Sequence, residues 1–373
     1  MSREFRRQHR DIKGLTFSGN ATARFSTGAI EHRVTAGGDW YRQTLWSLGQ
    51  RTRVGVAPVS FLNPVYGVNP VSSYDLSAGR RDLADTTAHR YGMFVQEQAT
   101  LGRFILVGGL RQDWFDDRDE GDPKTSGNRL SWRVGGIVKP IDPVSLYVNY
   151  SQSFEPQDPG SQSASVGDPF APIANCQIEV GAKGSLLGGR LQPTVALYRI
   201  VQNNILQEDP NIPPVGGFDQ LRPLGEVTSK GVEFTLAADV TPDWVVTANY
   251  AYNDAQITQG VPGVVIDSSF GTRFPNAPQH QAGLWSRYQF PRWDLGLALG
   301  GHYVSKQSDR RGNQIPGYTI FDGSITKGLG FMDVMLRVEN IFDKTYALSA
   351  LDEIRGSFLG RPRSVFVELR KTI

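Results

Sequence analysis

The sequence lacks any run of apolar residues long enough for a transmembrane helix. Such a helix needs about 20 predominantly apolar residues, and the chain of 373 residues is only 39% hydrophobic. Cysteine is almost absent, because Cys176 is the single one and cannot form an internal disulfide. The formal net charge of +2 is too small to indicate a nucleic-acid partner. These absences exclude a helical membrane protein and a disulfide-stapled domain.

The N-terminus lacks the apolar stretch that follows the charged residues of a secretory signal peptide. Arg6 and Arg7 form a twin-arginine pair, but no apolar segment follows them. We therefore expect no signal peptide in this chain.

Catalytic and metal-binding patterns are missing as well. The five histidines are scattered without the paired spacing of a metal site, and no glycine-rich phosphate loop or nucleophile elbow is present. Some outer-membrane barrels are lipases that use Ser and His, and His280 or His302 lies near serines, but nothing is placed to orient such a base. We expect no enzyme, no catalytic residue, no bound metal and no nucleic-acid partner.

The sequence does contain a long series of segments that alternate apolar and polar side chains. Val334, Leu336 and Val338 alternate with Asp333 and Arg337, for example. A period of two is that of a β-strand with two different faces. A charged face cannot lie in lipid, where each charge costs about 2–4 kcal/mol at the midplane. If these strands cross a membrane, the charged face must therefore line a water-filled interior or contact a protein domain that fills it. The pattern predicts about fifteen strands, near residues 13–26, 29–46, 85–101, 103–116, 129–140, 143–155, 177–188, 190–207, 226–239, 243–256, 280–290, 293–305, 318–328, 331–342 and 361–372.

The connections between these segments are alternately short and long. Thr27-Gly28 and Ile141-Asp142 are short ones, whereas 47–84 and 156–176 are long ones. Tight turns on one side and long loops on the other are typical of a transmembrane β-barrel. A soluble β-sandwich also alternates, but its strands are usually about 5 or 6 residues long, and a tilted membrane crossing needs about 9 to 11. We therefore predict an all-β fold, an antiparallel transmembrane β-barrel.

The odd strand number has a topological consequence. A complete bacterial barrel has an even number of strands and both ends on the periplasmic side. Here the last strand ends on the short-turn side, whereas the first begins on the long-loop side. We therefore expect residues 1–12 to be the end of an external loop and residues 13–373 to be a partial barrel. We also expect missing upstream strands and a wall that does not close.

Six short motifs occur in a fixed order between residues 143 and 373. They are Tyr147–Pro156, Glu179–Lys183, Ser229–Glu233, Phe274–His280, Asn340–Tyr346 and Gly360–Arg363. Together they resemble strand motifs of TonB-dependent outer-membrane receptors, and the first is similar to a segment of the ferric-siderophore (ferrichrome-type) receptors. Ile373 departs from that family, whose last residue is usually Phe.

The resemblance implies a 22-stranded barrel closed by an N-terminal plug domain that binds TonB. We expect this chain to supply about 15 C-terminal strands of such a barrel and to lack the plug domain. TonB would then be contacted only by the missing plug domain. The implied function is iron transport across the bacterial outer membrane, with a ferric siderophore as transported ligand, no cofactor held by side chains, and lipid as a second partner. A receptor for another TonB substrate (a vitamin, haem or a sugar) and a non-transporting barrel remnant stay open as alternatives.

Candidate ligand contacts come from aromatic residues near the long loops. Phe154 ends a strand in the siderophore-receptor-like segment, Trp114 and Phe115 end another, and Tyr346 and Phe358 lie in or beside the last long loop. Aromatic faces and Arg donors suit a bulky ferric siderophore, although such rings equally suit a girdle at the membrane interface. Structural roles are expected for the family-motif residues Asn340, Phe342, Asp343, Tyr346, Gly360, Pro362 and Arg363.

Overall fold

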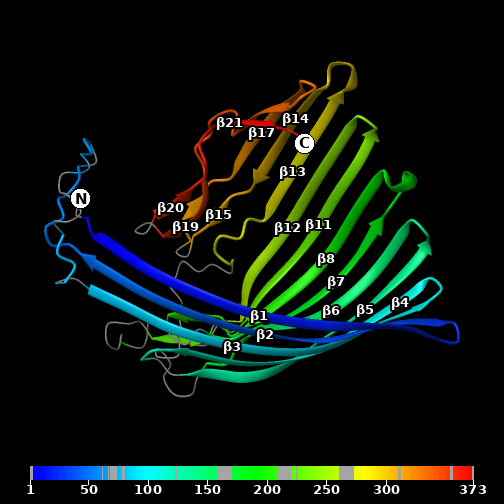
Figure 1. Cartoon of the computed structure of the whole chain (residues 1–373), viewed down its shortest axis with the longest axis horizontal. Helices are drawn as coiled ribbons and strands as arrows, with labels where there is room; N and C mark the ends of the chain where they lie inside the picture. The colour runs from blue at the N-terminus through cyan, green and yellow to red at the C-terminus, as the bar shows by residue number, and fades with distance from the viewer. Residues whose placement is uncertain are drawn as a thin grey trace.

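One antiparallel sheet of 15 strands makes up most of the chain (Figure 1). The computed structural model describes residues 3–60, 62–65, 67, 74–77, 80–121, 124–157, 170–208, 213, 220–223, 226–259, 273–309, 312–352 and 356–371. The strands of the sheet, in spatial order, are β1 (Phe5–Thr27), β2 (Ile30–Thr52), β3 (Arg80–Leu101), β4 (Phe104–Asp119), β5 (Thr125–Ile141), β6 (Val144–Glu155), β7 (Ile173–Gly184), β8 (Leu191–Asn203), β11 (Glu226–Thr241), β12 (Trp244–Gln259), β13 (His280–Phe290), β14 (Leu295–Val304), β17 (Tyr318–Gly328), β18 (Asp333–Glu339) and β21 (Ser364–Arg370).

Three small hairpins lie in the long connections. They pair β9 (Leu206–Glu208) with β10 (Leu221–Pro223), β15 (Gln307–Ser308) with β16 (Gln314–Ile315), and β19 (Ala347–Asp352) with β20 (Gly356–Leu359). Within the described ranges no helix is long and apolar enough to cross a membrane.

The predicted number of strands in the sheet is confirmed, and the largest boundary difference lies at its N-terminal end. β1 begins at Phe5 rather than at residue 13, because its ladder with β2 continues as far as the pair Phe5↔Thr52. The prediction that residues 1–12 belong to a loop is therefore wrong from Phe5 onward. Charged residues crowd this end of β1, where water can reach both faces of a strand, so no apolar–polar alternation marks it in the sequence.

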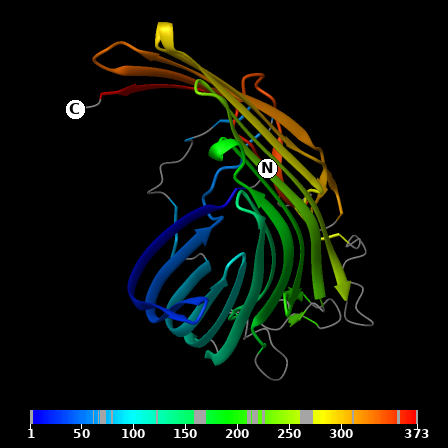
Figure 2. The same ribbon diagram turned by 90° about the vertical axis from the view of Figure 1, so that its right-hand side faces the viewer.

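The sheet is curved, and β1 and β21 are its two edge strands (Figure 2). β1 pairs with β2, and β21 pairs with β18. In the part of the chain that the structure describes, no ladder joins β1 to β21. The described wall is thus open along one side, as the odd strand number predicts.

The apolar face of the sheet carries an aromatic row at one level. Phe17, Trp40, Tyr91 and Trp114 are successive cross-strand partners on β1 to β4. Phe104 marks the other end of the apolar stretch of β4, ten residues away. That separation corresponds to about 33 Å along the strand, and to about 25 Å in height at a tilt of about 40°. The apolar band of an outer-membrane barrel, bounded by aromatic girdles, has the same height of about 25 Å.

The polar face is crowded, because long side chains cover glycines on neighbouring strands. The Phe94 ring lies over Gly37, and the Tyr147 ring lies over Gly181, where a Cβ would sit 2.6 Å from the Tyr147 hydroxyl. Gly108 on the apolar face has no such neighbour within 4 Å. Side chains that converge in this way indicate the concave side of the sheet, which faces the lumen in a barrel.

Candidate functional site

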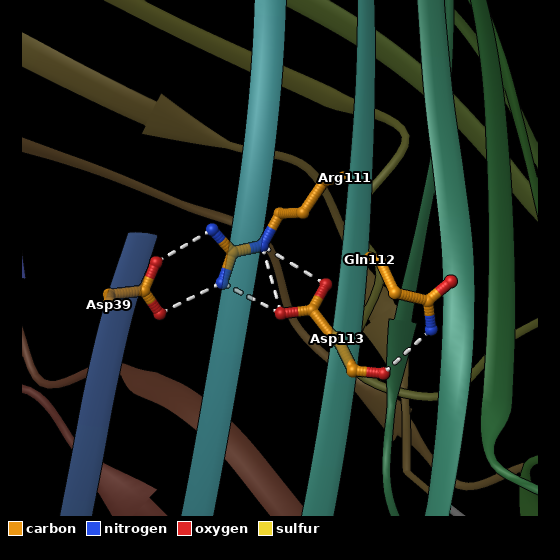
Figure 3. Close-up of polar contacts among 4 residues, drawn as sticks. All are labelled: Asp39, Arg111, Gln112 and Asp113. Atoms are coloured by element: carbon orange, nitrogen blue, oxygen red, sulfur yellow. Dashed lines mark hydrogen bonds and ion pairs between the residues drawn. The ribbon is translucent and has the colours of Figure 1, made fainter. Parts of the chain in front are cut away.

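A charged cluster lies on the polar face at β2 and β4 (Figure 3). Arg111 Nη1 and Nη2 donate to the two carboxylate oxygens of Asp39 at 2.8 and 2.9 Å. Arg111 Nε donates to both carboxylate oxygens of Asp113, at 2.9 and 3.0 Å. The neighbouring Gln112 side chain instead donates to the backbone carbonyl of Asp113 at 3.1 Å. One guanidinium thus bridges two carboxylates that belong to different strands.

Gly92 makes this bridge possible. It lies on β3 in the same cross-strand rung as Asp39 and Asp113, directly between them. Any side chain at Gly92 would overlap the Arg111 guanidinium. The three charged side chains stay partly open to water, and the cluster holds one carboxylate charge in excess. It therefore stiffens the wall and also offers acceptor oxygens to the lumen.

A cavity of about 280 Å³ opens beside this cluster, towards the long loops. Arg90 of β3 reaches it while paired with the buried Asp117 of β4, Nη2 to Oδ2 at 2.8 Å. Phe115 and Phe154 add aromatic surface, and Ser131 contributes a hydroxyl. Aromatic walls with a few polar groups are typical of small-molecule sites.

Phe115 and Phe154 meet across a gap in the sheet. Their ring centroids are 5.9 Å apart, and Phe115 is only 6% exposed. β5 and β6 stop pairing at Arg133↔Ser151 although both strands continue beyond that pair. The Phe115 ring crosses β5 over Gly127, where a Cβ would lie 2.9 Å from Cζ. The two rings therefore close the gap between these strands at the edge of the cavity.

The substitution Gly127→Ala should loosen this closure, because its methyl group must push the Phe115 ring aside. Overpacking of a well-filled site costs about 1–3 kcal/mol, and we expect about 1 kcal/mol since a ring edge can shift. The measurement is the free energy of unfolding from a urea titration in lipid vesicles. Gly136→Ala on the same strand is the matched control, because only Val148 Cγ1 lies near it, at 3.9 Å. Equal losses in both variants would contradict the proposed contact.

Trp114 lies on the opposite face from Phe115, because consecutive residues of a strand point to opposite sides. It is the last member of the aromatic row on the apolar face, and it also lines the cavity. Tyr346 and Phe358 do not line this cavity, all of whose lining residues belong to β3 to β6 or directly follow β6. Phe358 lies exposed on β20. The structure therefore brings three of the five candidates to this cavity, Trp114, Phe115 and Phe154, of which Phe115 and Phe154 are in ring contact.

Asn340 organises the turn at which β18 ends. It has a left-handed backbone conformation (φ 50°) and is 2% exposed. Its Nδ2 donates to the carbonyls of Lys344 and Arg361 at 2.9 and 3.1 Å, and its Oδ1 accepts from the Lys344 backbone N–H at 2.9 Å. Asp343 Oδ1 accepts from the Arg363 backbone N–H at 2.8 Å. These two side chains tie both ends of the last long connection together.

The other family-motif residues pack around this turn. The Tyr346 ring lies over Gly360 and 4.4 Å from the ring of Tyr318, centroid to centroid. Phe342 is exposed and contacts Phe321 edge-on at 5.6 Å. Pro362 precedes β21, which begins at Ser364. Tyr346 thus makes structural contacts in the described wall.

The sequence gives little signal for the charged residues of the cluster. Arg111 and Asp39 are 72 residues apart and meet only through the register of three strands. Alternation places Asp39, Arg111 and Asp113 on polar faces, but it does not say which strands are neighbours at which level.

No group of His, Cys, Asp or Glu side chains in the described ranges could hold a metal ion, and Cys176 is a half-buried free thiol.

A protein-family comparison matches residues 2–341 to the family described as TonB dependent receptor-like, beta-barrel. Among curated proteins, the ferrichrome outer membrane transporter/phage receptor of Escherichia coli K12 is 30% identical over 371 residues, which cover 92% of this chain and 46% of that protein. The ferrioxamine B receptor of Salmonella typhimurium LT2 is 28% identical and covers 91% and 47%. The chain thus spans about half the length of these relatives.

Solved structures share the fold. The ferric-catecholate import receptor Fiu of E. coli K12, in its closed form, aligns with a TM-score of 0.81 at 23% identity, covering 98% of this chain and 55% of that one. The unliganded ferric citrate transporter FecA aligns with a TM-score of 0.78 at 18% identity, covering 100% and 56%.

Proposed function

Because the chain belongs to the TonB-dependent receptor β-barrel family, we propose that it forms barrel wall of an outer-membrane receptor for the uptake of ferric siderophores. The names of its relatives support this cargo, since they include receptors for ferrichrome, ferrioxamine B and catecholate siderophores. The relatives are transport receptors, and we propose transport rather than catalysis for this chain. The siderophore is cargo and not a cofactor.

The cavity at β3 to β6 is the proposed point of ligand contact. Phe115 and Phe154 present ring faces there, and Arg90 and Arg111 present N–H donors, although each guanidinium is already engaged by a carboxylate. Ion-paired arginines are held in position before a ligand binds and still have unused donors, because a guanidinium has five N–H groups. We propose that a siderophore stacks on the rings and accepts hydrogen bonds from these donors.

The apolar face would contact outer-membrane lipid, with the row from Phe17 to Trp114 at one interface. TonB would act through a plug domain of the whole receptor, and we propose no TonB contact for the wall itself. The observation that carries the proposal is the joint occurrence of an apolar band about 25 Å high and a polar concave face with a cavity near the long loops.

The test is TonB-dependent uptake of radioactive iron. The chain would be fused behind the N-terminal half of the E. coli ferrichrome transporter and expressed in cells without their own siderophore receptors. We expect uptake of at least one ferric siderophore when TonB is present and none when TonB is deleted. A fusion that is folded and exposed at the cell surface yet takes up no ferric siderophore would contradict the proposal.

A further inference from the structure

The gap between β5 and β6 lies in the long-loop half of the apolar band. In the part of the chain that the structure describes, ladder pairing between the two strands ends at Arg133↔Ser151, although β5 stays paired with β4, and β6 with β7, to their long-loop ends. Asn128 of β5 is the cross-strand partner of Trp114, so the aromatic row crosses the unpaired part of β5. Arg133 lies five residues further along β5, about 17 Å of strand and about 13 Å of height at a tilt of about 40°. The gap therefore begins inside the apolar band, at the level of the lipid chains.

Side chains from the two faces of the sheet meet in this gap. Phe115 lies on the polar face, because the preceding residue, Trp114, is on the apolar face. Arg133 and Ser151 form a cross-strand pair on the polar face. Phe154 lies three residues beyond Ser151 on β6 and therefore belongs to the apolar face. The rings of Phe115 and Phe154 are nevertheless in contact, and a contact between opposite faces requires an interruption of the wall between them.

The cavity beside the charged cluster reaches through this gap. Its lining includes Arg111 and Asp113 of the polar face as well as Trp114 of the apolar face. On the apolar face, the unpaired part of β5 carries Leu130 and Trp132, which are 53% and 40% exposed. The space thus has guanidinium and carboxylate groups at its lumen end and exposed apolar side chains at its lipid end.

The unpaired backbone along the gap needs polar partners, because a peptide group without a hydrogen bond is costly at the level of the lipid chains. Irregular backbone is tolerated at this depth where it lines a water-filled cavity, and a cavity lies at this gap. A ligand with an amide group beside an apolar chain could pair with the same backbone groups. The rings of Trp132 and Tyr150, with centroids 4.7 Å apart, close the gap at its inner end.

We propose that the gap admits the acyl chain of an amphiphilic ferric siderophore, whose chelating head occupies the cavity while the chain lies among the lipids of the outer leaflet. The inference rests on the proposed uptake function and names its substrate class. The two parts of such a molecule match the two ends of the space: N–H donors of Arg90 and Arg111 for the chelating oxygens, and apolar surface for the chain. The rings of Phe115 and Phe154 form the gate, because their contact separates the cavity from lipid.

The experiment measures binding of two probes to the fusion receptor in outer-membrane vesicles: a ferric tris-hydroxamate with a dodecanoyl chain and the same chelate with an acetyl group. Binding to vesicles without the receptor is subtracted, because the longer chain also enters lipid by itself. We expect the receptor to bind the dodecanoyl chelate at least about 10-fold more tightly than the acetyl chelate, since only the longer chain covers apolar surface at the gap.

Leu130→Gln should weaken binding of the dodecanoyl chelate about 5-fold and binding of the acetyl chelate less than about 2-fold, because Leu130 lies beside the gap but does not line the cavity. Leu197→Gln is the matched control. Leu197 of β8 is 51% exposed and pairs with Val180 on the apolar face, away from the gap. It should change neither affinity by more than about 2-fold.

A second measurement uses only the unaltered receptor, so it does not depend on the folding of any variant. A photoreactive diazirine at the end of the dodecanoyl chain should label Leu130 and Trp132 in preference to Leu197. An excess of the acetyl chelate should abolish this labelling, because both chelates compete for the cavity. Labelling that persists under this competition would show that the gap takes up free lipid chains, and it would overturn the inference.

The remaining outcomes separate this inference from the uptake function. Equal affinity for the two chelates, equal losses in Leu130→Gln and Leu197→Gln, or even labelling of Leu130 and Leu197 would overturn the inference and leave uptake intact. The same holds if neither chelate binds to a fusion that takes up another ferric siderophore. Failure of the uptake function shows instead as a folded fusion that takes up no ferric siderophore at all, and the inference then fails with it.

Discussion

Replacement of Arg111 by Gln should lower the free energy of unfolding by about 2 kcal/mol. The variant leaves Asp39 and Asp113 facing one another across Gly92 with no cation between them. Loss of one partner from a fully buried pair costs about 3–5 kcal/mol. We expect less here, because water reaches all three side chains. The measurement is a urea titration of the barrel in lipid vesicles.

Two controls separate the charge effect from the loss of a side chain. The neutral triple variant Asp39→Asn/Arg111→Gln/Asp113→Asn should recover most of the stability, because no unpaired carboxylate remains. Arg133→Gln removes an arginine of the same face that has no carboxylate partner in the described ranges, and it should cost less than about 0.5 kcal/mol. A triple variant as unstable as the single one would show that repulsion between Asp39 and Asp113 is not the cause.

The strands inside the apolar band could be predicted from the sequence, whereas their extensions could not. Lipid on one face and water on the other impose the alternation seen at Val334 to Val338, so that pattern predicts β18 and its neighbours. Beyond the band the selection for an apolar face disappears, and β1 continues to Phe5 through a charged segment. Its pairing is visible only in the ladder with β2.

Only part of the candidate site could be predicted, because a single segment shows which aromatic residues end a strand but not which strands lie side by side. Phe115 and Phe154 stand out as aromatic residues at strand ends, and the structure places their rings together. Trp114 stands out equally, but alternation within one strand puts it on the apolar face. Arg111 carries no local signal, because its role depends on where β2 stands relative to β4, with Gly92 between them. Register between distant strands is set by the whole sheet and not by any single segment.

Asn340→Ala should be the most damaging single substitution in the C-terminal part of the wall, at about 3–4 kcal/mol. It removes the three side-chain hydrogen bonds to Lys344 and Arg361, each worth about 1 kcal/mol net. It also places Ala in a left-handed conformation (φ 50°), which costs a further ~1 kcal/mol. The measurements are the urea unfolding free energy and the amount of heat-resistant folded barrel in the outer membrane.

Asn340→Gly separates the two contributions, because glycine adopts the left-handed conformation without strain but restores no hydrogen bond. We expect it to fall between the unaltered chain and Asn340→Ala, closer to Ala, since the hydrogen bonds account for most of the loss. Asp343→Asn keeps an oxygen that can accept from the Arg363 backbone N–H, and it should cost less than about 1 kcal/mol. If Asn340→Gly were as stable as the unaltered chain, the hydrogen bonds would be dispensable. Asn340 would then serve only to turn the backbone, and the connection to β21 would be held by the packing of Tyr346 on Tyr318.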